Sequence, residues 1–102
     1  MSIINEIKPL QNEMIDWRRI IHKHPELGFE EKFTSDFIAE KLTEFGIDIH
    51  RGLAKTGVVG KIVNGNGPSI GLRADMDALP VEEKNTFEYR SKFPGKMHAC
   101  GH

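Results

Sequence analysis

A thiol and an imidazole stand two residues apart at the carboxyl end of the chain, on Cys100 and His102. In an extended or looped segment, side chains at i and i+2 project to the same side, so both groups could reach one cation. A thiolate beside an imidazole suits zinc or another borderline divalent metal. Because tetrahedral zinc takes three or four protein donors, this pair supplies only part of a site. The alternative is a small buried cysteine next to a surface histidine.

Two carboxylates, Asp75 and Asp77, directly follow an apolar run at residues 69–72. If that run is a strand of an open α/β sheet, the carboxylates lie beyond its carboxyl end, where ligands gather. Either of them would then bind a metal or orient a histidine that does. The alternative is a solvated turn after the strand.

A second histidine pair, His22 and His24, lies in a segment with helical periodicity. Side chains at i and i+2 of a helix point about 200° apart, so one shared metal is not expected there. Both imidazoles are expected to be ordinary residues of a helix C-terminus, where the macrodipole favours positive charge. Arg18 and Arg19 are expected on the solvated face. A cysteine–histidine nucleophile would need an orienting group and an oxyanion hole, and the sequence indicates neither.

Two helices are predicted to position these residues. The first covers residues 5–24, with Ser2 or Asn5 as its cap, Pro9 within its first turn, and a stop before Pro25. The second covers residues 30–45 and ends at Gly46, because glycine adopts the left-handed conformation without a Cβ penalty. The first helix carries an apolar stripe that is expected to face a core, with partner binding as the alternative: Ile7, Leu10, Met14, Trp17 and Ile21.

Strand signals follow the helices at residues 47–50, 57–63 and 69–72. Two helices followed by hairpin-like strands indicate an α+β or α/β beginning. Residues 81–94 mix charged, polar and aromatic side chains without a period, which predicts a long loop with at most one short strand. Loops of that length in a compact domain are usually functional or poorly ordered.

Composition sets the class of protein. The chain has 102 residues, of which 38% are apolar and 28% charged, with a net charge of -1, which fits one small globular domain. That balance provides no basic surface for nucleic acid and no polybasic membrane anchor, and no apolar run reaches a membrane-spanning length. The start of the chain lacks the pattern of a secretory signal, and a single cysteine cannot form an internal disulfide. These features favour a cytoplasmic protein.

Several of these motifs together resemble the N-terminal part of the M20 metallopeptidase family, in its amidohydrolase branch of hippurate hydrolases, N-acyl-amino-acid amidohydrolases and indole-acetyl-amino-acid hydrolases. The resemblance spans nearly the whole chain. It is carried by Arg18-Arg19 with His22, H-P-E-L-G-F-E-E at 24–31 with Thr34, Thr56-Gly57, R-A-D-M-D-A-L-P at 73–80 and M-H-A-C-G-H at 97–102.

The resemblance implies an α/β fold in which residues 1–102 are the truncated N-terminal portion of a di-metal, aminopeptidase-like catalytic domain. It implies two divalent metal ions in the longer parent protein, zinc or manganese, with cobalt or nickel as further options. Cys100 and His102 match two of the metal ligands. Asp77 matches an aspartate that orients a ligand, while Asp75 takes the place of that ligand histidine, which puts its direct metal binding in doubt. His98 is not a ligand in the family.

The resemblance also implies hydrolysis of the amide bond of an N-acyl amino acid, in which a glutamate beyond residue 102 acts as general base. A dimer or other homo-oligomer is implied for the parent. This piece is expected to be inactive alone and to self-associate through an open sheet edge. The alternative function is a free-standing module that binds metal or a partner without catalysis, and a deliberately excised piece is a third reading of the same sequence.

Overall fold

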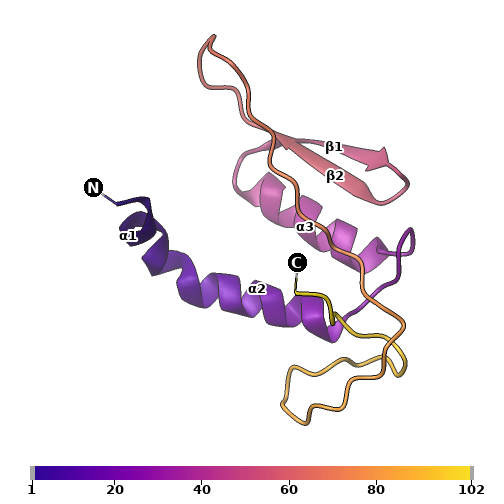
Figure 1. Ribbon diagram of the computed structural model, residues 1–102. Coiled ribbons are helices and arrows are strands. Elements are labelled where there is room, and N and C mark those ends of the chain that lie inside the picture. Colours follow the sequence, from indigo (N-terminus) through magenta and orange to yellow (C-terminus); the bar gives the residue numbers. More distant parts are fainter. Residues whose placement is uncertain (1, 102) are drawn as a thin grey trace.

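The polypeptide passes through helices, then a hairpin, then extended segments, over residues 2–101 that this computed structural model describes (Figure 1). The elements are α1 (Ile3–Ile7), a short 3-10 helix η1 (Lys8–Leu10), α2 (Gln11–Lys23), α3 (Lys32–Glu44), β1 (Asp48–Leu53) and β2 (Gly57–Lys61). The predicted order of helices followed by paired strands is confirmed. None of the helices within residues 2–101 has the length and apolar character to cross a membrane.

The predicted first helix is interrupted near Pro9. Instead of one helix over residues 5–24, α1 begins at Ile3, and η1 separates it from α2. Proline lacks a backbone N–H and cannot continue an α-helical ladder, so the chain tightens into a 3-10 turn there. The predicted end is confirmed, because α2 stops at Lys23 with His24 as its C-cap, before Pro25.

The apolar stripe of this first helical segment is largely uncovered. Ile7, Leu10 and Met14 are exposed, so the expectation that the whole stripe faces a core is wrong for residues 2–101. Only its later part packs, where the Trp17 ring lies 5.7 Å from that of Phe45 at the end of α3. Figure 1 shows the reason: α1 and the start of α2 stand apart from α3 and the hairpin.

The side chain of Glu26, which precedes α3 in the sequence, caps the first turn of that helix. Glu26 accepts hydrogen bonds from the backbone N–H groups of Phe33 (2.8 Å) and Thr34 (2.7 Å), and from the Thr34 hydroxyl (2.7 Å). These are N–H groups that the first helical turn leaves unpaired. The helix begins at residue 32 instead of the predicted 30, because Phe29 has a left-handed backbone (φ 67°) that reverses the chain first. Gly46 adopts φ 76° just past the helix, as predicted.

Arg51 makes the polar contacts between the hairpin and α3. Strands β1 and β2 pair antiparallel, with Asp48 opposite Lys61, and a bulge interrupts the register between Arg51 and Leu53. Arg51 donates to Ser35 Oγ (3.0 Å) and to Asp36 Oδ1 (2.6 Å). The Arg51 hydrogen bond lowers the pKa of Asp36, against a smaller opposing effect of burial. The hairpin prediction is therefore confirmed, with boundaries shifted by a few residues.

The predicted third strand does not form. Residues 69–72 are not part of any strand pairing among residues 2–101, and Ile70 and Leu72 are 88% and 93% exposed. A strand needs a neighbour to satisfy its backbone groups, and the hairpin of residues 48–61 does not supply one. Several buried residues instead belong to α3 or to the segments before it and around residue 78: Pro25, Thr34, Ser35, Ala39 and Ala78. The radius of gyration of 15.5 Å exceeds the roughly 13 Å of a compact domain of this size.

Replacing Glu26 by alanine is expected to lower the free energy of unfolding by about 2 kcal/mol, because three hydrogen bonds to a carboxylate at a helix start are lost. Chemical denaturation followed by circular dichroism measures the change. Glu30→Ala, in the same turn, is the control and should leave stability nearly unchanged. Equal stabilities of the two variants would contradict the capping role.

The isolated chain is expected to self-associate through the unpaired, apolar segment around Ile70 and Leu72. Size-exclusion chromatography with light scattering should report species larger than a monomer. The double variant Ile70→Lys/Leu72→Lys should shift the population toward monomer, whereas Lys61→Ala on β2 should not. A monodisperse wild-type monomer would count against this expectation.

Candidate functional site

A short antiparallel contact brings the two chemically interesting segments together. Leu79 and Met97 exchange both backbone hydrogen bonds at 3.0 Å, and the N–H of Ala78 donates to the carbonyl of Glu26 at 2.8 Å. Because the pairing is antiparallel, the chain after Met97 runs back alongside the residues that precede Leu79. This pairing therefore brings the segment that carries Cys100 back toward Asp77.

These segments line a half-open cavity of about 440 Å³ together with α2 and with Ile38 of α3. Asp75, Asp77 and Cys100 line it from the two paired segments, and Arg18 and His22 line it from α2. A cavity of this size can hold a small organic molecule. The structure thus places the predicted residues Asp75, Asp77 and Cys100 on one cavity, whereas His102 lies outside the described residues.

The two carboxylates differ in environment. Asp75 is exposed and accepts a hydrogen bond from Arg73 at 3.0 Å, as expected for a residue in a solvated turn. Asp77 is half-buried, and its Oδ2 is 4.0 Å from where a Cβ on Gly28 would stand. A larger residue than glycine at position 28 would therefore bring its side chain against this carboxylate. Asp77 is the more constrained of the two.

Cys100 is exposed, so the reading of this residue as a buried hydrophobe is wrong. A thiol and carboxylates around one cavity are a donor set that suits a borderline divalent cation. Within residues 2–101, however, no three metal-binding side chains come close enough to form a cluster. The donor chemistry fits a metal, and the described part of the chain supplies only a portion of its ligands.

His98 presents a buried nitrogen beside these groups. Its Nε2 is inaccessible and has no hydrogen-bond partner among residues 2–101. Burial lowers the pKa of His98, and the nearby His22 lowers it further, while Asp77 and Glu26 oppose the shift without reversing it. His98 therefore contributes a neutral imidazole to the wall of the cavity.

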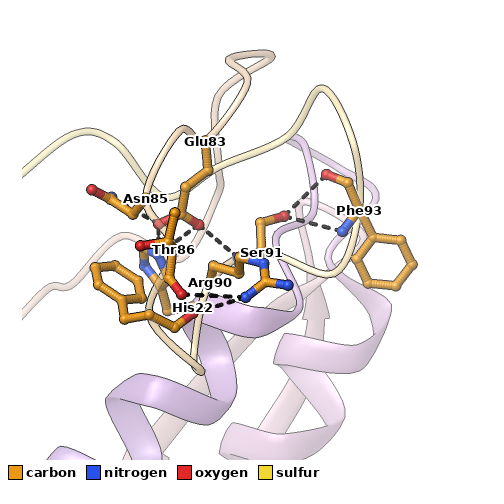
Figure 2. Close-up of polar contacts among 8 residues, drawn as sticks. His22, Glu83, Asn85, Thr86, Arg90, Ser91 and Phe93 are labelled. Carbon is orange, nitrogen blue, oxygen red and sulfur yellow. Dashed lines mark hydrogen bonds and ion pairs between the residues drawn. The ribbon is translucent and has the colours of Figure 1, made fainter.

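The sequence did not predict the buried pair formed by His22 and Glu83, which Figure 2 shows. His22 is 8% exposed, and its Nε2 lies 3.1 and 3.0 Å from the two oxygens of Glu83. Since a carboxylate only accepts, the proton between them belongs to Nε2. His22 is thus not the ordinary helix-end imidazole that was expected. Ile15, which is half-buried, precedes His22 by seven residues and so lies on the same face of the helix. This spacing could have indicated that His22 is buried.

His24, by contrast, behaves as a helix-end residue. Its Nδ1 is 2.8 Å from the carbonyl oxygen of Ile20, and its ring stacks on that of Phe33 at 4.1 Å. The two imidazoles therefore do not converge, as the helical spacing predicted.

Aromatic side chains from the long loop cover this end of α2. The rings of Phe87 and Tyr89 stack at 4.0 Å, and the Arg19 guanidinium lies 4.3 Å from the Tyr89 ring centre. Arg18 lies over the same ring at 5.8 Å. The two arginines are exposed, as expected for a solvated face, but both also pack on an aromatic ring.

A second, larger cavity of about 860 Å³ lies between α3, the hairpin and residues 72–77. Glu31 lines it, is 7% exposed, and has an inaccessible Oε1 without a hydrogen-bond partner among residues 2–101. Glu31 belongs to the motif at residues 24–31, but no periodicity in the sequence indicates its burial, because a glutamate at a helix start is usually solvated.

Comparisons with known proteins agree with the motifs. Residues 71–102 match the model described as Peptidase family M20/M25/M40. A hippurate hydrolase of Campylobacter jejuni is 50% identical over 103 residues, which are 100% of this chain and 27% of that protein. An N-acyl-L-amino acid amidohydrolase of Geobacillus stearothermophilus is 46% identical, over 98% of this chain and 26% of its own length.

Solved structures agree as well. A Bacillus subtilis protein described as a dinuclear metal binding peptidase of the M20 family superposes with a TM-score of 0.85 at 43% identity, over 92% of this chain and 27% of that one. The chain therefore spans about a quarter of the length of the relatives that it matches.

The Glu83 carboxylate makes the docking of the long loop dependent on pH. Burial raises its pKa, but hydrogen bonds from Asn85, the Ser91 N–H and His22, with the His22 charge, together bring the pKa below the ordinary 4.5. The stabilisation is therefore complete above pH 4.5 and is lost as the pH falls through the lower, folded-state value.

The amide resonance of Ser91, which donates to Glu83, is expected to shift in an acid titration with a midpoint below 4.5. Glu83→Gln should abolish this transition, and Glu88→Gln in the same loop should leave it unchanged. A midpoint above the ordinary value, or a transition that survives in Glu83→Gln, would contradict the assignment.

Proposed function

Since this chain belongs to peptidase family M20/M25/M40, we propose that residues 1–102 form the N-terminal portion of the catalytic domain of a metal-dependent amidohydrolase. The proposed substrates are N-acyl amino acids of the hippurate type, and the products are a carboxylic acid and an amino acid. The relatives named hippurate hydrolase and N-acyl-L-amino acid amidohydrolase support this substrate class. The observation that carries the proposal is the Leu79–Met97 contact, which directs Asp77 and Cys100 to one cavity.

In this proposal Cys100 and His102 hold a divalent cation, and Asp77 orients a ligand beside it. Two cations, zinc or manganese, are proposed by analogy with the relative described as dinuclear metal binding. When bound, such cations act as Lewis acids that polarise an amide carbonyl and make water a stronger nucleophile near neutral pH. No residue among 1–102 is assigned as general base.

The chain's own residues would shape the site around the substrate. The hydrogen bond from Ala78 to Glu26 holds the backbone next to Asp77. The neutral His98 and the apolar Ile21 form part of the cavity wall. Arg18 adds a permanent positive charge to the lining. We place the protein in the cytoplasm as a homo-oligomer that acts on small molecules, not on nucleic acid or membranes.

A second candidate function is a small module that binds metal or a partner without catalysis. The observation that favours it is the donor set on the 440 Å³ cavity, a thiol and two carboxylates, which suits a cation whether or not an amide is cleaved. The two functions differ in what accompanies metal binding, because only the hydrolase releases an amino acid from an N-acyl substrate.

Cys100→Ala is expected to reduce hippurate hydrolysis by the protein that carries this chain at least about a hundredfold, because a lost ligand costs more than a lost supporting hydrogen bond. Release of glycine measures the rate. Cobalt absorption gives a second readout, since a band from a cobalt–thiolate bond should disappear with the thiol. Ala99→Ser, at the exposed neighbouring position, is the control.

Unchanged turnover and metal content in Cys100→Ala would refute the proposal, and metal binding without any hydrolysis in the wild type would favour the second candidate. The 102-residue chain alone should show neither turnover nor sub-micromolar zinc binding in calorimetry.

A further inference from the structure

The loop that joins the two halves of the candidate site is anchored on α2 by a buried pair of side chains and by contacts around it. Residues 80–96, the connecting loop, leave the site at Leu79 and return to it at Met97, where the two backbones pair. Nothing in the local sequence holds so long a segment in one conformation, because it has neither helical nor strand periodicity. Its order must come from contacts with the rest of the chain.

Glu83 organises the connecting loop from within. Its side chain is 3% exposed, and it accepts hydrogen bonds from the Ser91 N–H at 2.6 Å and from Asn85 at 3.0 Å. The first of these bonds draws the two arms of the loop together across eight residues. A second carboxylate, that of Glu82, accepts from the Gly95 N–H and closes the loop nearer to Met97.

His22 joins this organised loop to α2. Its Nε2 donates to the Glu83 carboxylate across 61 residues of sequence, and the Lys92 N–H donates to the Lys23 carbonyl at 3.0 Å beside it. The His22 ring also meets the Phe87 and Tyr89 rings edge-on, at 6.1 and 6.2 Å. The helix end and the connecting loop are thereby held by both polar and aromatic contacts, of which Figure 2 shows the bond between His22 and Glu83.

The same imidazole faces the candidate site. His22 lines the 440 Å³ cavity with Asp77 and Cys100, and its ring centre lies 6.4 Å from that of His98, two residues before Cys100. The His22 side chain therefore contacts Glu83 in the connecting loop and also forms part of the wall of the candidate site. A shift of the loop would move Met97, and with it the segment that carries Cys100.

We propose that His22 and Glu83 are positioning residues of this site: their buried hydrogen-bonded pair fixes the connecting loop on α2 and so sets where Cys100 meets Asp77. The inference rests on the proposed function insofar as it treats Cys100 as a metal ligand. Neither residue touches substrate or metal in this account, and neither exchanges a proton with them.

Hydrogen exchange of the full chain at neutral pH tests the anchor without any metal. His22→Leu should speed exchange of the Ser91 and Met97 amides about tenfold to a hundredfold, since a buried hydrogen bond to a charged group is lost. Amides in the middle of α3, such as that of Ala39, should be unaffected. The rate of Cys100 alkylation by iodoacetamide should change at least about threefold, because a displaced segment alters access to the thiol.

Conservative and control variants separate positioning from general stability. His22→Gln retains an N–H donor near the place of Nε2 and should restore most of the protection, while Glu83→Gln should lie between His22→Gln and His22→Leu. His50→Leu, an exposed histidine on β1, and Glu88→Gln, in the connecting loop, should match the wild type.

Equal acceleration of the α3 amides in His22→Leu would show a purely structural role and overturn the proposal. Unchanged Met97 exchange together with unchanged Cys100 reactivity would also overturn it. Cobalt binding by the protein that carries this chain tests the metal ligand and the positioning role separately. If the wild type shows no cobalt–thiolate band, the proposal that Cys100 is a metal ligand is refuted. A band that weakens in His22→Leu and returns in His22→Gln supports the positioning role.

Discussion

One glutamate, Glu26, connects the helical half of the molecule to the half that carries the candidate site. Its carboxylate satisfies the free N–H groups at the start of α3, and its backbone carbonyl receives the N–H of Ala78. The side chain and the main chain of a single residue thus fix a helix and an extended segment relative to each other. Pro25, which directly precedes Glu26, is fully buried and restricts the backbone conformation there because its ring fixes φ.

Much of the interior of this chain is polar and hydrogen-bonded. Thr34 and Ser35 are buried at the capped start of α3, and His22 is buried against Glu83. Such groups are stable inside a protein only when their partners are in place, so each of them demands a specific arrangement. The apolar surface, by contrast, remains largely exposed on α1, η1 and residues 69–72. The chain matches about a quarter of the length of its relatives.

Local signals in the sequence predicted the elements well where local physics decides. Gly46 ended α3 in a left-handed conformation, Pro25 ended α2, and the hairpin formed where the strand signals lay. The predictions were wrong where the outcome depends on a neighbouring segment that pairs with or covers the residues. Residues 69–72 have a strand-like composition but no neighbour among residues 2–101 to pair with, and the stripe around Leu10 has no layer to cover it.

The sequence alone determined the resemblance to the M20 family, through the motifs at residues 24–31, 73–80 and 97–102. It also determined which residue types could serve the chemistry, because these follow from side-chain identity and spacing. Only the tertiary structure decided that Asp77 and Cys100 share a cavity, and that His22 meets Glu83. Contacts across 61 residues leave no periodicity in a single sequence. They depend on how α2 and the loops pack, which is a property of the folded chain.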